Sequence, residues 1–398
     1  MTKSLVLVLL AAAPCIATAQ SSTTRWPEQR SAIARAVGFL ADGEPLGYLN
    51  EPSGADTFLR LDAGTTGLEV RSIPVATTGR VHDVTALPDL DGDGLAELAL
   101  VETGVAGTGS NVLLLDGATG TRRGVEFLPE LEPLGLLSLG RNEAGPWLGI
   151  VTADSSGSVR LRIHHARGLG FASESASASA SAAIEYAGVN NPWAAVSLPT
   201  GPEERPADVA VLGVSDNSRV TVAVRNSRTG DVLSSLSFGA ALVPVDVIAL
   251  PDVFPDGSPE LALLGEADEG RIVGVLIKEI DSGKTVARYR FSPNYLPTRL
   301  LHIPVPGSAG VLGVIGQRGN GNIALQRRDL DSGNALENVR FRAHYAPDDA
   351  ALLKLPGQDS SKGVAIIGFD AFGHARLEVR DASTGAVLLN RDLRQADE

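Results

Sequence analysis

The chain has 398 residues with 47 acidic and 34 basic side chains, which give a net charge of −13. An acidic surface repels phosphate backbones and anionic lipid headgroups, so neither nucleic acid nor an anionic membrane surface is expected as a partner. Glycine (44) and proline (23) are frequent, whereas aromatic residues make up only 5%. Short apolar runs end at Gly, Pro, Asp or Asn, which is typical of strands and turns rather than of long helices.

The first 19 residues have the pattern of a secretory signal peptide. Lys3 supplies a positive start, Leu5 to Ala13 an apolar core, and Ala17-Thr18-Ala19 a small-residue cleavage site. The apolar run is too short to span a bilayer. We therefore expect cleavage near Ala19 and a secreted, periplasmic or cell-surface protein with no membrane insertion. The single cysteine, Cys15, lies within this signal, so the exported chain must be stable without disulfides.

An acidic loop follows in the segment Leu87 to Leu98, LPDLDGDGLAEL. Four carboxylates on one short loop repel one another, and their alternate spacing lets their oxygens surround a hard cation such as Ca²⁺. An EF-hand would place its bidentate acid at the twelfth loop position, whereas the acid here falls at the ninth, so the loop is shorter and flanked by strands. The alternative is a solvated Asp-Gly turn. The side chains expected to bind the metal are those of Asp89, Asp91, Asp93 and Glu97.

A second, weaker candidate for a metal site lies at Leu250 to Leu261, LPDVFPDGSPEL. Phe254 stands where the first loop has its middle aspartate. Fewer anionic ligands lower the affinity for calcium. The acids that keep their spacing in this copy are Asp252, Asp256 and Glu260.

A turn of the form Asp-x-x-Thr-Gly recurs about every 53 residues along the chain. In such a turn Asp accepts hydrogen bonds from its own backbone and Gly takes a positive φ, so we expect a structural rather than a binding role. The one long interval contains the low-complexity segment Ala172 to Ala183, which we expect to be an extended loop. The turns end at Gly67, Gly120, Gly230, Gly283, Gly333 and Gly385, with a weaker copy at Gly168.

Each repeat unit contains four expected strands, which is the sequence signature of a β-propeller blade. We predict an all-β, seven-bladed propeller of four-stranded antiparallel blades, with six blades as the fallback, because the first two strands of the first unit are weak. Residues 20–30 are expected to form an N-terminal leader, and residues 31–398 a single propeller domain. The expected blades are about 31–78, 79–130, 131–190, 191–240, 241–294, 295–345 and 346–398.

The sequence LPDLDGDGLAELAL followed by SNVLLLDGATG resembles the FG-GAP and VCBS repeats of integrin alpha-subunit propellers and of many secreted bacterial proteins. The periodicity extends the resemblance over nearly the whole exported chain, but the acidic loop is intact only in residues 79–130. The Phe-Gly and Gly-Ala-Pro signatures of the repeat are not preserved. The resemblance implies that the loop joins the first two strands of a blade and binds structural Ca²⁺. The ligands it implies are the side chains of Asp89, Asp91, Asp93 and Glu97 and the carbonyl of Leu95.

We find no arrangement of catalytic residues in the sequence. No Gly-x-Ser-x-Gly elbow occurs, no cysteine follows the signal, and the pair His164-His165 is expected in an exposed turn. A catalytic site needs several converging groups. The histidines instead fall in different repeat units at unrelated positions, which are His82, His164, His165, His302, His344 and His374.

We therefore expect a non-catalytic, monomeric binding or interaction scaffold whose partner is a protein or a glycan. Two alternatives stay open. The turns also resemble the repeats of pyrroloquinoline-quinone dehydrogenases, although phenylalanines (Phe127, Phe238, Phe291 and Phe341) stand where those repeats carry Trp. The second alternative is that the chain is a structural module of an envelope complex.

Overall fold

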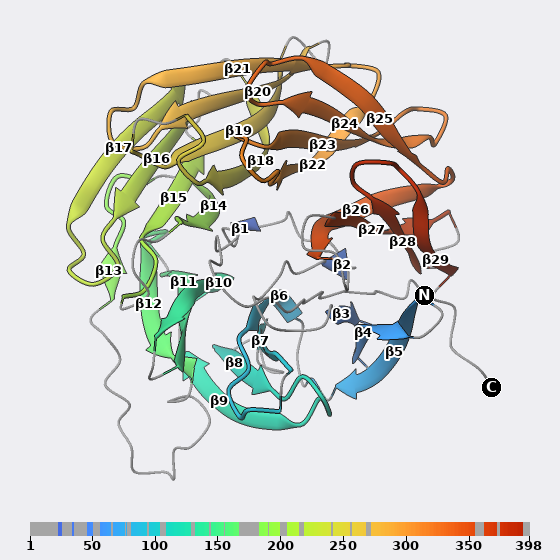
Figure 1. Ribbon diagram of the computed structural model, residues 1–398. Coiled ribbons are helices and arrows are strands. Elements are labelled where there is room, and N and C mark those ends of the chain that lie inside the picture. Colours follow the sequence, from blue (N-terminus) through green and yellow to red (C-terminus); the bar gives the residue numbers. More distant parts are fainter. Residues whose placement is uncertain are drawn as a thin grey trace.

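Antiparallel strands make up almost all of the computed structural model, in agreement with the predicted all-β propeller. The sheets follow one another around a central axis in sequence order (Figure 1). The structure describes residues 23–25, 34–35, 46–50, 56–64, 67–75, 77, 81–93, 95–103, 109–128, 132–142, 145–154, 156–166, 183–189, 191–199, 205–214, 219–239, 242–254, 257–267, 272–354, 362–371 and 375–392.

Six four-stranded blades, A to F, carry described side chains. Blade A contains β6 (Val81–Leu87), β7 (Glu97–Thr103), β8 (Ser110–Leu115) and β9 (Arg122–Leu128). Blade B contains β10 (Glu132–Asn142), β11 (Gly145–Ala153), β12 (Val159–His165) and β13 (Ile184–Glu185). Blade C contains β14 (Pro192–Ser197), β15 (Val209–Val214), β16 (Val220–Arg225) and β17 (Val232–Gly239).

The remaining three blades repeat the same order. Blade D contains β18 (Val243–Leu250), β19 (Glu260–Ala267), β20 (Ile272–Glu279) and β21 (Thr285–Phe291). Blade E contains β22 (Leu296–Ile303), β23 (Val311–Gln317), β24 (Ile323–Asp329) and β25 (Ala335–Phe341). Blade F contains β26 (Tyr345–Lys354), β27 (Lys362–Asp370), β28 (Ala375–Asp381) and β29 (Val387–Asp392).

An N-terminal sheet precedes blade A. It contains β2 (Ala34–Arg35), β3 (Leu46–Asn50), β4 (Asp56–Gly64) and β5 (Gly67–Val75). For most of its residues the structure describes the backbone alone. Blades A to F agree with the fallback count of six rather than with the first expectation of seven. The predicted signal peptide, residues 172–182 of the predicted extended loop and the turn at Gly168 lie outside the described residues.

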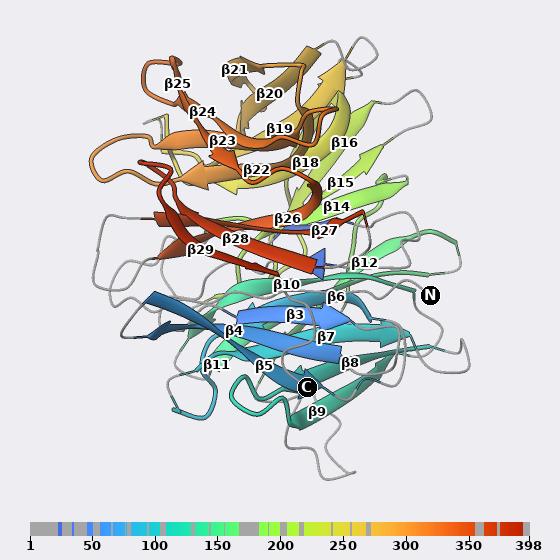
Figure 2. The same cartoon turned by 90° about the vertical axis from the view of Figure 1, so that its right-hand side faces the viewer.

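The core lies between adjacent blades rather than within any one of them. Apolar side chains of blade C, such as Val222, pack in one cluster with those of blade D, such as Leu263. Equivalent clusters join blades A and B, B and C, D and E, and E and F. Full burial of one such aliphatic side chain is worth about 1.5–3 kcal/mol. Neighbouring blades therefore stabilise each other. Figure 2 shows the arrangement of the blades from the side.

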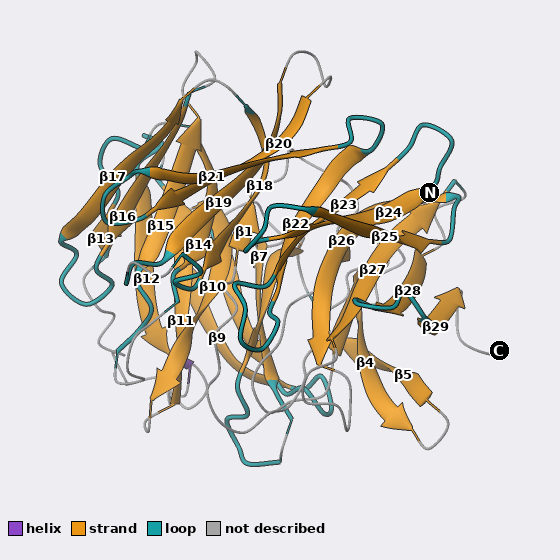
Figure 3. Ribbon diagram, turned by 45° about the horizontal axis from the view of Figure 1, so that its top comes forward, coloured by secondary structure: helices purple, strands orange, loops and turns teal. Residues whose placement is uncertain are grey.

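The recurrent turns have the structural role predicted from their sequence. In blade A, Oδ1 of Asp116 accepts hydrogen bonds from the amides of Ala118 (2.9 Å) and Thr119 (2.7 Å). The amide of Gly120 donates to the Asp116 carbonyl, and Gly120 has a φ of +71°. In blade D the residue at the Asp position is Glu279, because the carbonyl that accepts the Gly283 amide belongs to it. These turns lie with other loops at the ends of the strands (Figure 3).

The first strand of each blade lies nearest the axis, and each of these strands has a β-bulge close to its start. Aspartates next to the bulges link neighbouring blades. Asp83 of blade A accepts from the amide of Val84 at 2.7 Å and from that of Leu136, in blade B, at 2.8 Å. Asp246 of blade D likewise accepts from its own strand and from Leu300 of blade E, at 2.7 Å. Both carboxylates are buried, and their hydrogen bonds with backbone amides compensate for the loss of water.

Candidate functional site

The acidic loop, residues 88–96, connects the two innermost strands of blade A. Leu87, the last residue of β6, lies opposite Glu97, the first residue of β7. Leu87 and Leu98 are fully buried and fix both ends of the loop against the core. The backbone between Leu87 and Glu97 has to turn within nine residues, which brings the side chains of the loop to one end of the blade.

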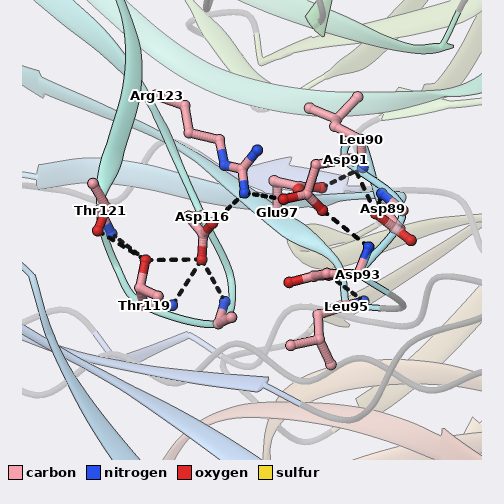
Figure 4. A network of polar contacts seen from close by, with 12 residues as sticks. Asp89, Leu90, Asp91, Asp93, Leu95, Glu97, Asp116, Thr119, Thr121 and Arg123 are labelled. Atoms are coloured by element: carbon pink, nitrogen blue, oxygen red, sulfur yellow. Dashed lines mark hydrogen bonds and ion pairs between the residues drawn. The ribbon is translucent and has the colours of Figure 1, made fainter.

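Three of the predicted ligands converge in this loop. One carboxylate oxygen from each of Asp89, Asp91 and Glu97 lies within 4.8 Å of the others (Figure 4). Asp93 is exposed on the same loop, outside this group of three, and its Oδ1 accepts the amide of Leu95 at 2.7 Å. Oxygen atoms at such separations are the ligands that Ca²⁺ prefers.

The backbone of the loop is organised by its own aspartates. Oδ1 of Asp89 accepts from the amide of Gly92 at 2.6 Å and from that of Asp91 at 3.1 Å. Oδ1 of Asp91 accepts from the amide of Asp93 at 3.1 Å. Gly92 has a φ of +86°, which an L side chain rarely adopts. The alternate carboxylates therefore define the loop conformation as well as its charge.

Arg123 joins the acidic loop to the recurrent turn of the same blade. Its Nη2 donates to Oδ2 of Asp91 and to Oδ2 of Asp116 (Figure 4). The hydrogen bond from Arg123 lowers the pKa of Asp91 below its usual value. Sequence reasoning missed Arg123 and Asp116, although the signal was present, because Arg123 comes three residues after the turn glycine, Gly120. Of the three converging acids, Asp91 thus already has a cationic neighbour.

Glu97 is the buried acid of the group, with 1% of its surface exposed. Burial raises the pKa of this carboxyl to about 8, although the amide of Leu90, which donates to its Oε2 at 2.8 Å, acts in the opposite direction. Partial desolvation, together with repulsion from the carboxylates of Asp91 and Asp89, also raises the pKa of Asp93, although its side chain is largely exposed. Without a cation these groups are costly to ionise, and a bound divalent ion would favour their charged forms.

The second predicted loop has another arrangement. Oε2 of Glu260 accepts from the amide of Val253 and its Oε1 from that of Phe254, both at 3.2 Å. Asp252 accepts from the amide of Gly257 at 3.0 Å. Phe254 is half-buried and packs against the core shared by blades D and E. Asp256 lies outside the described residues. Within the described part of the chain, only the first loop brings three acids together.

The described histidines lie in separate environments. The expectation of an exposed pair His164-His165 was wrong, because both belong to β12, where His164 is 7% exposed and burial lowers its pKa to about 4. His165 instead stacks on Trp147, with ring centroids 3.3 Å apart. His302 contacts the carbonyl of Ala309 through Nε2 at 2.9 Å. His82 lies on β6 in blade A and His344 at the start of blade F, and His374 is outside the described residues.

Three of the phenylalanines that stand in place of Trp each make the same kind of contact between neighbouring blades. The cation of Lys278 lies over Phe238, that of Arg328 over Phe291 and that of Arg380 over Phe341, at 5.6–5.9 Å from the ring centroids. Each pair joins the fourth strand of one blade to the third strand of the next. A cation–π contact of this kind contributes about 0.5–1 kcal/mol. These rings therefore serve blade packing.

No protein-family model matches the sequence, and no curated protein is similar to it in sequence. Solved structures show the fold. Hydrazine synthase of Kuenenia stuttgartiensis aligns with a TM-score of 0.50 and 13% identity, over 90% of this chain and 94% of that one. BBS1N in complex with ARL6DN gives 0.51 and 12%, over 87% and 90%. A puromycin-hydrolyzing peptidase of Mycobacterium tuberculosis gives 0.52 and 14%, over 89% of this chain and 52% of that one. Among the described residues, no helix is long and apolar enough to cross a membrane.

Proposed function

We propose that the protein is an exported β-propeller that binds one structural Ca²⁺ and serves as a non-catalytic scaffold for a protein or glycan partner. The observation that carries this proposal is the convergence of Asp89, Asp91 and Glu97 in the loop that closes the innermost hairpin of blade A. Asp93 and the Leu95 carbonyl, on the same loop, are the further ligands. Ion binding there stabilises the folded blade by mass action.

The chemistry of the loop supports calcium over softer metals. All the side-chain donors are carboxylate oxygens, with neither nitrogen nor sulfur among them, and such ligands suit Ca²⁺. The resemblance to FG-GAP and VCBS repeats supports the same ion. Extracellular calcium modules work at dissociation constants of about 10⁻⁴–10⁻³ M, so even a weak site is useful to an exported protein.

We further propose that the N-terminal sheet is the seventh blade. Like the other blades it has four strands in sequence order, β2-β3-β4-β5. Strand β5 contacts β29, and β2 contacts β26 and β27, all in blade F. A side-by-side contact between the first and last sheets is what a closed propeller requires, because closure leaves no broad apolar face exposed.

A scaffold role is supported by the separation of the chemically reactive side chains. The described histidines lie in different blades or pack against other groups. Propellers present loops on a rigid ring, and function lies in those loops. The alternative, a pyrroloquinoline-quinone dehydrogenase, predicts a different result. Addition of the quinone with Ca²⁺ would then produce dye-linked alcohol oxidation, and that result would overturn the scaffold proposal.

The test of calcium binding is thermal unfolding in EDTA and in excess Ca²⁺. We expect Ca²⁺ to raise the melting temperature, since a ligand at 100 times its Kd contributes about 2.7 kcal/mol. Asp89→Asn should abolish the rise while the amide oxygen keeps the contacts with the Gly92 and Asp91 amides. The matched control is Asp252→Asn in the second loop, which should keep the rise. Equal melting curves in EDTA and Ca²⁺ would overturn the proposal.

A further inference from the structure

A short N-terminal strand, β1 (Thr23–Arg25), lies apart from the N-terminal sheet. It hydrogen-bonds with β14 of blade C, pairing Thr23 with Val196, Thr24 with Ala195 and Arg25 with Ala194. In this five-stranded sheet β1 is next to the innermost strand. It also contacts β10 and β18, the first strands of the two neighbouring blades. Strand β1 therefore lies toward the axis, inside the ring of first strands (Figure 1).

The backbone donors on the axial side of the blades explain why β1 pairs with blade C. In each first strand, one equivalent amide follows the bulge. Four of these amides donate hydrogen bonds to the two aspartates described above. Asp83 accepts from Val84 and Leu136, and Asp246 accepts from Val247 and Leu300.

In blade F the equivalent amide, that of Ala350, donates to Asp349 at 2.8 Å. In blade C it belongs to Ala195. The two positions from which an aspartate would reach it are Gly135 in blade B and Ala194 in blade C itself, and neither has a side-chain acceptor. Thr24 of β1 lies directly opposite Ala195. A buried backbone donor needs a partner, and here a strand stands where the other blades use a carboxylate.

We propose that the axial edge of β14 is a strand-acceptor site for an extended peptide, and that its occupant is the chain's own N-terminal segment around Thr23–Arg25. Main-chain hydrogen bonds provide the affinity in this mode of recognition, as in other cases of strand addition to a sheet edge. The segment then closes the axial side of blade C and can be replaced by a peptide of the same sequence. This inference is independent of calcium binding.

The test uses the full chain with Thr24→Pro, because proline cannot donate to a ladder and disfavours pairing. Ser21→Pro, just outside β1, is the matched control. Hydrogen exchange should become at least tenfold faster at Ala194–Ser197 in the Thr24→Pro protein and stay unchanged in the control. Trypsin should also cleave faster after Arg25 in the former. Unchanged exchange and cleavage in Thr24→Pro would overturn the assignment of β1 to this edge.

A binding experiment tests whether the axial edge of β14 accepts a peptide in trans. A fluorescent synthetic peptide of residues 20–30 should bind the Thr24→Pro protein and bind the unsubstituted chain at least tenfold more weakly. Failure to bind a Thr24→Pro protein whose β14 has been exposed would overturn the acceptor site.

A second variant, Gly135→Asp, tests the same pairing without a substitution in β1. Gly135→Asp places a carboxylate where Asp83 and Asp246 stand in their blades, so it should compete with β1 for the Ala195 amide. We expect the same faster cleavage after Arg25. Unchanged cleavage in a folded Gly135→Asp protein would contradict the carboxylate argument.

Discussion

The acidic loop of blade A and its counterpart in blade D have the same flanking residues but differ in the middle of the loop. In both, a buried leucine ends the first strand opposite a buried glutamate that starts the second, Leu87 with Glu97 and Leu250 with Glu260. Each glutamate accepts amide hydrogen bonds from the loop, seven residues before it in the sequence. The glutamate is thus part of the blade architecture, whether or not a metal is bound.

The difference lies in the middle of the loop. Asp91 of blade A faces Asp89 and Arg123, whereas Phe254 of blade D packs into the core between two blades. One loop gathers charge that has to be neutralised, and the other buries an apolar ring. A blade-entry loop can therefore be closed by ion binding or by hydrophobic packing.

Removing the glutamate at the end of either loop should destabilise that loop. Glu260→Ala leaves two loop amides without their acceptor, and we expect a loss of about 2–3 kcal/mol in the free energy of unfolding, with or without Ca²⁺. Glu97→Ala should cost a similar amount and also remove the response to Ca²⁺. Urea denaturation in EDTA and in Ca²⁺ measures both. A Glu97→Ala protein that keeps its full calcium response would contradict the role given to this residue.

The stability of the metal-free protein should depend on pH through Glu97. Its folded pKa, about 8, lies above the ordinary value of 4.5, so the unfolded chain ionises first. In EDTA the stabilisation that the protonated Glu97 gives to the folded state is full below about pH 4.5 and is lost as the pH rises through 8. Ca²⁺ should remove this decline because it binds the ionised form.

Glu97→Gln serves as the control for the pH effect, because the amide oxygen can still accept from Leu90 but does not titrate. The decline measured in EDTA should be smaller in this variant than in the unsubstituted chain. Identical pH profiles for the two proteins would show that other groups cause it.

Phe254→Asp should move the second loop toward the first. We expect a loss of about 1–2 kcal/mol in EDTA, since a half-buried ring leaves the core. Excess Ca²⁺ should recover part of this loss, because the loop regains its middle carboxylate. Melting curves at rising Ca²⁺ concentration provide the measurement. Phe254→Ala, which loses the ring without gaining an acid, should show no such recovery.

Arg123→Ala should have the smallest effect, and its size should depend on calcium. The partly exposed guanidinium neutralises Asp91 and Asp116, so we expect a cost of about 1 kcal/mol in EDTA. The cost should fall in Ca²⁺, since the ion then neutralises Asp91. An equal cost in both conditions would show that Arg123 acts only through Asp116 and the turn.

Much of this molecule could be predicted from the sequence because its repeats record local chemistry. The Asp-x-x-Thr-Gly turns and the apolar runs fix the four-stranded blades, and the Asp-Gly spacing locates the acidic loop. The contribution of Arg123 depends on how the loop and the turn of one blade meet. The pairing of β1 with β14 depends on which axial amides the aspartates leave available. Neither arrangement leaves a periodic signal in the sequence.

Calcium binding is tested most directly by a calorimetric titration of the EDTA-treated, dialysed protein with Ca²⁺. One ion should bind per chain, with binding lost in Asp89→Asn and retained in Asp252→Asn. Absence of calcium binding, or equal binding by the Asp89→Asn protein, would contradict this prediction.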